Sequence, residues 1–295
     1  MNTIIRLFAF VGVFSLILLN RVEISCATDE EIKASEVQVK TPVYHPSHDY
    51  DFPLGTYTYE VSWQGIPAAE ATISIEREPG LYMAEATART YSGIDIFYKL
   101  RYRAEGLVSE KDFSPLRVTF EKKENRKDRF TAISYLDNGE ILTVRENFDK
   151  DPNSESPDIE QFNPNNFTLE PFSAAFLARS LDWAPGVSRD FDTYNGKARY
   201  LITLNCVEKK VIEFNNQERE VFVVEPRVKN LTKPDADKKL RRAQIFVSTD
   251  KKREVLKIVS EVFIGSVTTK LESFHPSYGT PMQVAGTERS KKLIF

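Results

Sequence analysis

The chain has 295 residues, of which 41% are hydrophobic and 28% charged, so it is neither disordered nor fibrous and has enough apolar material for a folded core. Its 40 lysines and arginines stand against 43 aspartates and glutamates, and the net charge of -3 gives no excess of cations for binding nucleic acid. With two cysteines and three histidines, we predict no disulfide framework and no metal site.

Residues 1–27 have the pattern of an export signal. One positive charge in Met1–Arg6 precedes the apolar run Leu7–Leu19, and the small residues Ser25, Cys26 and Ala27 form a cleavage site. The apolar run is too short to span a bilayer comfortably, and no later segment is long enough to do so. We expect cleavage after Ala27 and a periplasmic protein without a transmembrane span. Lipidation at Cys26 and retention of the signal as an anchor are the alternatives.

Strands dominate the first half of the remaining chain. Residues 28–51 are charged and aperiodic, which predicts a mobile leader. From residue 54 the period changes to two, and Tyr57, Tyr59 and Val61 share one face of a half-buried strand. Further strands are predicted around 69–75 and over 81–91, 98–109, 116–122, 129–136 and 141–147. The short turns between them, such as 137–139 (DNG), favour antiparallel pairing.

The second half begins with a polar stretch, 149–166, whose three prolines predict a long loop. Phe172–Leu181 follows with apolar residues spaced four apart, which predicts a helix. Strands are then predicted over 199–207, 211–214, 220–225, 244–248, 255–264 and 267–274. Cys206 lies in one of these apolar runs and is expected in the core. The last stretch, 275–295, has no period and is expected to be a tail.

These elements predict a mostly β domain over residues 52–274 with one main α-helix. Two arrangements remain open. One is a single large curved antiparallel sheet, and the other is a pair of β halves, 52–148 and 167–274, joined by the loop 149–166. Either arrangement is barrel-like or resembles a lipoprotein carrier.

One charged row is a candidate binding site. The chain has no nucleophile elbow, phosphate-binding loop or dinucleotide glycine fingerprint, so we predict no cofactor and no catalytic residue. Basic and aromatic residues alternate on one strand and its neighbour, and the six candidates are Arg89, Lys99, Arg101 and Arg103 with Tyr98 and Tyr102. The cations suit a phosphate or carboxylate headgroup, with the aromatics holding the apolar part. The alternative is a solvated face with cross-strand ion pairs.

Residues 54–68 (LGTYTYEVSWQGIPA) resemble the opening strand of a bacterial exported family catalogued as domain of unknown function 3108. The family pattern is L-x-Y-x-V-x-W-x-G-I-P-A followed by glycine, and Ala69-Glu70 stands here in place of the glycine. Three later segments also agree, namely 96–100 (IFYKL), 171–179 (PFSAAFLAR) and 263–271 (FIGSVTTKL). Over about residues 52–274, the resemblance implies a periplasmic β-rich protein of Gram-negative bacteria. It supplies no catalytic residues.

The leading functional expectation is a non-enzymatic periplasmic protein that binds or carries a lipid or another hydrophobic or amphiphilic envelope component. The alternative is a structural protein that contacts an envelope protein through its sheet edges or the basic segment 289–292 (RSKK) and so supports envelope assembly. A hydrolase that uses carboxylates is a third hypothesis.

Overall fold

The computed structural model describes residues 39–47, 50, 53–148, 157–232, 242–262 and 265–277, which form fifteen strands and two helices. The first eight strands are β1 (Gly55–Trp63), β2 (Ile66–Glu78), β3 (Leu81–Thr90), β4 (Leu100–Ser109), β5 (Pro115–Glu124), β6 (Lys127–Tyr135), β7 (Ile141–Asn147) and β8 (Asp158–Phe162). The other seven are β9 (Thr168–Leu169), β10 (Ser188–Tyr194), β11 (Arg199–Phe214), β12 (Gln217–Asn230), β13 (Ala243–Ser248), β14 (Val255–Glu261) and β15 (Ser266–Pro276). The helices are α2 (Ser92–Asp95) and α3 (Pro171–Ser180).

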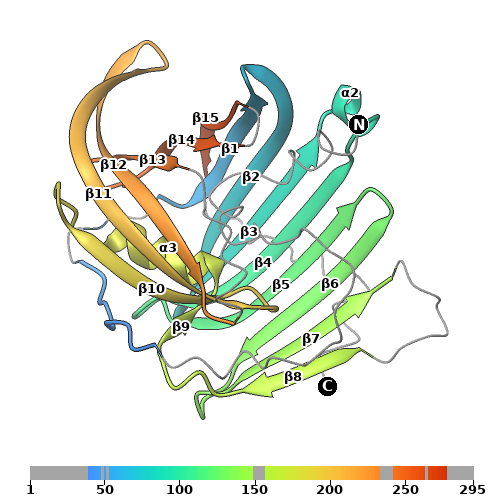
Figure 1. Cartoon of the computed structure of the whole chain (residues 1–295). Helices are drawn as coiled ribbons and strands as arrows, with labels where there is room; N and C mark the ends of the chain where they lie inside the picture. The colour runs from blue at the N-terminus through green and yellow to red at the C-terminus, as the bar shows by residue number, and fades with distance from the viewer. Residues whose placement is uncertain are drawn as a thin grey trace.

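All fifteen strands belong to one curved sheet, in the order β8 to β1 followed by β15 to β9 (Figure 1). Neighbouring strands are antiparallel except β9 and β10, which are parallel. The last strand, β15, pairs with the first, β1, and so joins the two runs of hairpins. The predicted fold class is confirmed, and of its two arrangements the single large sheet is the one formed.

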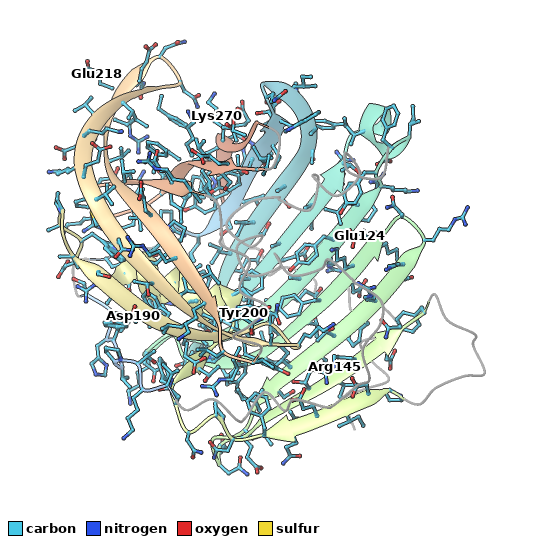
Figure 2. The ribbon with its side chains drawn as sticks, viewed as in Figure 1. Glu124, Arg145, Asp190, Tyr200, Glu218 and Lys270 are labelled. Atoms are coloured by element: carbon cyan, nitrogen blue, oxygen red, sulfur yellow. The ribbon has the colours of Figure 1, made fainter. Side chains whose placement is uncertain are left out.

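The two ends of the sheet meet through side chains. The Phe162 ring of β8 lies 5.1 Å from the Tyr194 ring of β10, and the Thr143 hydroxyl donates to the Tyr194 hydroxyl over 3.1 Å. Arg145 of β7, labelled in Figure 2, donates to the carbonyl of Gly196. These contacts roll the sheet into a barrel-like body.

Local sequence accounts for the strands. Along β1, Tyr57, Tyr59 and Val61 are buried while the residues between them are half-buried, as the period of two predicts. The long β11–β12 hairpin turns at Asn215 and Asn216, whose φ angles are +50° and +60°. Asparagine tolerates this left-handed region better than most residues, and a turn of this hand matches the twist of the strands. The hairpin extends past its neighbours and curls at its tip (Figure 1).

The predicted helix is confirmed as α3, whose first turn is closed by Glu170. The Glu170 carboxylate accepts hydrogen bonds from the backbone N–H groups of Phe172 (2.7 Å) and Ser173 (2.5 Å). Pro171 occupies the first helical position, where a missing N–H leaves no helical hydrogen bond unmade.

The main core lies inside the rolled sheet, between α3 and strands of both runs. The Phe176 ring lies 5.8 Å from that of Tyr82 and 5.9 Å from that of Phe113. Phe172 lies directly against Gly106 of β4, where an added Cβ would overlap the ring. Glycine is therefore required at this position of β4 for the helix to pack this closely.

Two stretches differ from their predictions. β8 lies inside the stretch 149–166 that was predicted as a loop. Phe162 is the one well-buried residue of β8, and it lies opposite Ile141 of β7. The alternation of buried and exposed residues along β8 is therefore too weak to predict a strand. Residues 39–47, predicted as part of a mobile leader, are hydrogen-bonded to the folded body. The Tyr44 hydroxyl accepts from the Asp190 N–H (3.0 Å), and the Ser47 N–H donates to the Ser180 carbonyl (3.0 Å).

The remaining predictions concern Cys206 and the two ends of the chain. Cys206 is buried, as expected. The sheet extends to Pro276, two residues into the predicted tail. The predicted signal peptide (1–27), the leader residues 28–38 and the tail residues 278–295 lie outside the described residues.

Candidate functional site

The cations predicted as a binding row lie on the face of β3 and β4 opposite the buried core residues. Arg89 and Arg101 are cross-strand neighbours, and Lys99 is exposed just before β4 begins. Each arginine forms an ion pair with a nearby carboxylate: Arg89 with Glu70 (3.0 Å), Arg101 with Asp95 (2.5 Å) and Arg103 with Glu85 (2.9 Å). The hydrogen bond from Arg101 lowers the pKa of Asp95, as expected for a carboxylate held by a guanidinium.

The aromatic members of the row face the other way. Tyr98 and Tyr102 are buried, and the Tyr98 hydroxyl donates to Glu124 over 2.9 Å. Successive strand residues point to opposite faces, so these tyrosines and the cations cannot contact the same ligand. The six predicted residues therefore do not form one site. The alternative interpretation, cross-strand ion pairs, describes Arg89 and Arg103, whereas Arg101 pairs with Asp95 of α2.

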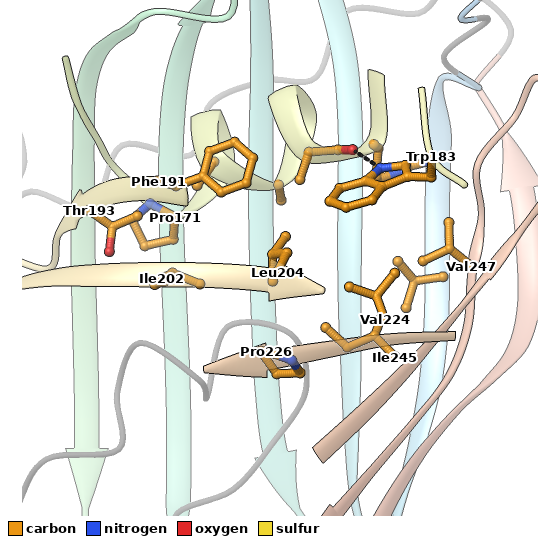
Figure 3. Close-up of a pocket in the computed structure, with 15 residues that line it drawn as sticks. Pro171, Trp183, Phe191, Thr193, Ile202, Leu204, Val224, Pro226, Ile245 and Val247 are labelled. Carbon is orange, nitrogen blue, oxygen red and sulfur yellow. Dashed lines mark hydrogen bonds between the residues drawn. The ribbon is translucent and has the colours of Figure 1, made fainter. Parts of the chain in front are cut away.

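A pocket instead lies between α3 and the face of β10–β14 that is turned toward it (Figure 3). Its lining residues are Pro171, Ala174, Ala175, Ala178, Arg179, Trp183, Phe191, Thr193, Ile202, Leu204, Val224, Pro226, Ile245, Val247 and Val255. Nearly all of this wall is apolar. Its volume of about 110 Å³ approaches that of an engineered apolar cavity, about 150 Å³, that takes up benzene. It therefore has room for a short length of hydrocarbon.

The composition of α3 explains why this space is left. Phe172 and Phe176 are four residues apart and fill the core on the side of the N-terminal run. The opposite side carries Ala174, Ala175 and Ala178, whose single methyl groups line the pocket without filling it. The pocket is thus the gap that three small side chains leave between a helix and a sheet.

Trp183 lines the pocket, and Arg189, which is not a lining residue, stacks on the Trp183 ring and on that of Tyr44. The Trp183 indole N–H donates to the Ala178 carbonyl over 2.8 Å, which fixes the ring against α3 (Figure 3). The Arg189 guanidinium lies 5.6 Å from the centre of the Trp183 ring and 5.4 Å from that of Tyr44. Arg189 forms no ion pair within the described part of the chain. Its guanidinium donates to the Asp182 carbonyl (2.9 Å), and its Nε is buried without a hydrogen-bond partner. A positive charge is therefore held against the ring of Trp183, a residue of the pocket wall.

A second cation, Arg179, is part of the pocket wall. Its guanidinium donates to the carbonyl oxygens of Arg253 (2.9 Å) and Lys252 (3.0 Å). Burial alone would lower the pKa of Arg179, but the neighbouring phenol groups of Tyr50 and Tyr57 raise it. Arg179 is therefore a permanent cation.

Sequence reasoning missed this site. It placed the helix correctly but gave no reason to expect a pocket beside it. The available signal was the pair of contrasting helix faces, one of phenylalanines and one of alanines. Within the described residues, no three His, Cys, Asp or Glu side chains gather in a metal-binding arrangement. In the same part of the chain, neither helix has the length and apolar character needed to cross a bilayer.

The fold places the protein in the class of barrel-like proteins built from one rolled β-sheet. A beta-barrel-like protein of domain of unknown function DUF1849 from Brucella abortus matches with a TM-score of 0.54 and 9% identity, covering 77% of this chain and 99% of the other. A candidate lipoprotein from Parabacteroides distasonis matches with a TM-score of 0.28 and 9% identity, covering 81% of this chain and 100% of the other. No curated protein matches the sequence significantly. The family model "Protein of unknown function (DUF3108)" matches residues 58–272, and the chain belongs to this family.

Proposed function

We propose that the protein binds an amphiphile with an acyl chain and an anionic head, and carries it in the cell envelope. The observation that carries the proposal is the apolar pocket between α3 and β10–β14. Hydrocarbon placed there would leave water for a wall of alanine, valine, leucine and isoleucine side chains, which is favourable by about 25 cal/mol per Å² of apolar surface removed from water. Ligand pockets are commonly of this kind, mostly apolar with a few polar groups that set orientation.

The charges near the pocket favour an anionic head. Arg189 stacks on Trp183, a residue of the pocket wall, and forms no ion pair within the residues that the structure describes. A guanidinium binds carboxylate or phosphate through two parallel hydrogen bonds, which a neutral head cannot reproduce. The site thus suits a fatty acid or a phospholipid more closely than a neutral hydrocarbon.

The proposed location is the periplasm. The export-signal pattern of residues 1–27 supports it, as does the resemblance to an exported family. Amphiphiles that cross this aqueous compartment need a protein to cover their chains, because exposed hydrocarbon is unfavourable in water.

The experiment begins with the exported protein, purified without detergent, extracted with organic solvent and analysed by mass spectrometry. The delipidated protein is then titrated with a fluorescent fatty acid. We expect Ala175→Phe, which fills the pocket, to weaken binding at least about ten-fold, the effect of roughly 1.4 kcal/mol. Ala184→Phe makes the same change at an exposed position outside the pocket lining and should leave the affinity unchanged.

A second variant tests the head group. Arg189→Gln should weaken binding of a fatty acid but not of the alcohol with the same chain. If the protein carries no lipid and binds neither probe, the carrier proposal fails and the structural role in envelope assembly becomes the leading hypothesis. If Ala175→Phe and Ala184→Phe have equal affinity, the ligand binds elsewhere.

A further inference from the structure

Two consecutive apolar side chains project into solvent at one end of the sheet. Ile96 is 79% exposed and Phe97 is 67% exposed. They follow α2 in the connection between β3 and β4, and the next residue, Tyr98, is buried again. An isolated exposed apolar residue needs no explanation, but a projecting aliphatic–aromatic pair is typical of a contact surface.

The connection that presents this pair is held in place. The Asp95 carboxylate accepts hydrogen bonds from both terminal nitrogens of Arg101 and from the Thr90 hydroxyl. The Phe97 N–H donates to the carbonyl of Ile94 over 2.9 Å. The exposure of the pair is therefore built into the turn.

Exposed cations surround the pair. The neighbouring β5–β6 turn is fastened to this connection, because the Asn125 N–H donates to the Lys99 carbonyl (2.8 Å) and the Asn125 side chain accepts from the Lys99 N–H (3.0 Å). Figure 1 shows α2 and this turn along the same rim. The exposed basic residues of the two segments are Lys99, Lys123, Arg126 and Lys127.

The carboxylates nearby are already engaged. Asp128 pairs with Lys123 (3.4 Å), and Glu124 pairs with Lys122 (2.8 Å). Lys99 and Arg126 form no ion pair among the described residues. The rim therefore combines a projecting apolar pair with two cations, Lys99 and Arg126, that form no ion pair among the described residues.

We propose that this rim, defined by Ile96, Phe97 and the four exposed cations, docks on the surface of an anionic bilayer. The apolar pair enters the interface between headgroups and acyl chains, where aromatic and aliphatic side chains are favoured. The cations lie at the level of the lipid phosphates, and each strengthens binding by about five-fold at moderate ionic strength. A protein partner would need a complementary acidic, apolar surface, whereas an anionic bilayer offers both features over any area. This inference does not depend on the pocket.

The test uses the exported protein and vesicles of phosphatidylglycerol with phosphatidylethanolamine, compared with phosphatidylcholine alone. The double variant Ile96→Ser/Phe97→Ser should lower the partition constant on anionic vesicles at least about ten-fold. Lys99→Ser/Arg126→Ser should lower it by a factor of about twenty, and the effect should vanish at high salt. Ile159→Ser is the matched control, because Ile159 is 62% exposed on β8, away from the rim.

A site-specific readout separates the rim from any other membrane contact, including one made by the N-terminal apolar segment. Tryptophan in the variant Phe97→Trp should be quenched by vesicles of brominated phosphatidylglycerol, and tryptophan in Ile159→Trp should not. Equal quenching of the two, or equal partitioning of the rim variants and the control, would overturn the proposal. Self-association that Ile96→Ser/Phe97→Ser abolishes, without quenching at position 97, would assign the rim to a second copy of the chain instead.

Discussion

Glu170 is a fully buried carboxyl group, and it makes the stability of the protein depend on pH. Burial raises its pKa from 4.5 to about 7, and the backbone hydrogen bonds that it accepts from Phe172 and Ser173 oppose this shift only in part. Between these two pH values the unfolded chain has released the proton while the folded chain still holds it. The free energy of unfolding therefore falls as the pH rises through this window. The stabilisation that the protonated Glu170 contributes is fully present below pH 4.5 and is lost above about pH 7.

The magnitude follows from the two pKa values. Each unit of difference corresponds to about 1.4 kcal/mol, so ionisation of Glu170 should lower the free energy of unfolding by about 3 kcal/mol between pH 4.5 and pH 8. The variant Glu170→Gln removes the titration. Its carboxamide resembles the protonated carboxyl group, with one acceptor oxygen and a donor, so at pH 4.5 the two proteins should differ by no more than about 1 kcal/mol.

Urea unfolding, followed by tryptophan fluorescence at several pH values, measures this difference. Other titrating groups affect both proteins equally, so the difference between the two curves isolates Glu170. As the pH rises from 4.5 to 8, we expect the free energy of unfolding of Glu170→Gln to increase by about 3 kcal/mol relative to that of the wild type. Parallel curves, within about 0.5 kcal/mol throughout, would show that the buried group does not titrate in this window and would refute the reasoning.

Two further predictions concern packing and charge. Arg199 and Asp192 form a fully buried ion pair, so Arg199→Met should lower the free energy of unfolding by about 3–5 kcal/mol, and adding Asp192→Asn should recover part of the loss. No recovery in the double variant would mean that the packing of Arg199, and not its charge, is what matters. Gly106→Ala places a methyl group against the Phe172 ring and should destabilise by about 1–3 kcal/mol in thermal unfolding. The control Gly93→Ala adds its methyl group to open space, and an equal loss there would contradict the packing argument.

The sequence predicted the strands well where one face is buried and the other is not. Tyr57 and Tyr59 alternate with polar residues, and the structure buries both. The sequence could not predict that β1 pairs with β15. Pairing between strands so far apart in the chain depends on backbone hydrogen bonds and side-chain contacts that many other strands could also make. β8 was missed because its pairing with β7 needs only backbone groups, which leave no pattern in the side chains.

The predicted site failed for a related reason. A period of two correctly placed Arg101 and Arg103 on one face, but it says nothing about what lies across the neighbouring strands. The register sets Glu85 of β3 directly opposite Glu105 of β4, and Arg103 pairs with both. Arg89 and Arg103 are thus paired with carboxylates of neighbouring strands that only the register brings beside them, and Arg101 with Asp95 of α2.

The pocket was hidden because each of its walls looks like ordinary core. Leu204, Val224 and Ile245 each belong to an apolar stretch of a strand, and each stretch alone predicts only burial. What makes the space is the absence of bulk on the opposite side, at Ala174, Ala175 and Ala178. Alanine is the strongest helix former, so its presence in a helix is expected without any functional reason. A pocket made by small residues thus leaves no distinctive mark in a sequence until the strands that face the helix are known. In α3 the two roles are divided between faces, because the phenylalanines pack on β3 and β4 while the alanines line the pocket that faces β10–β14.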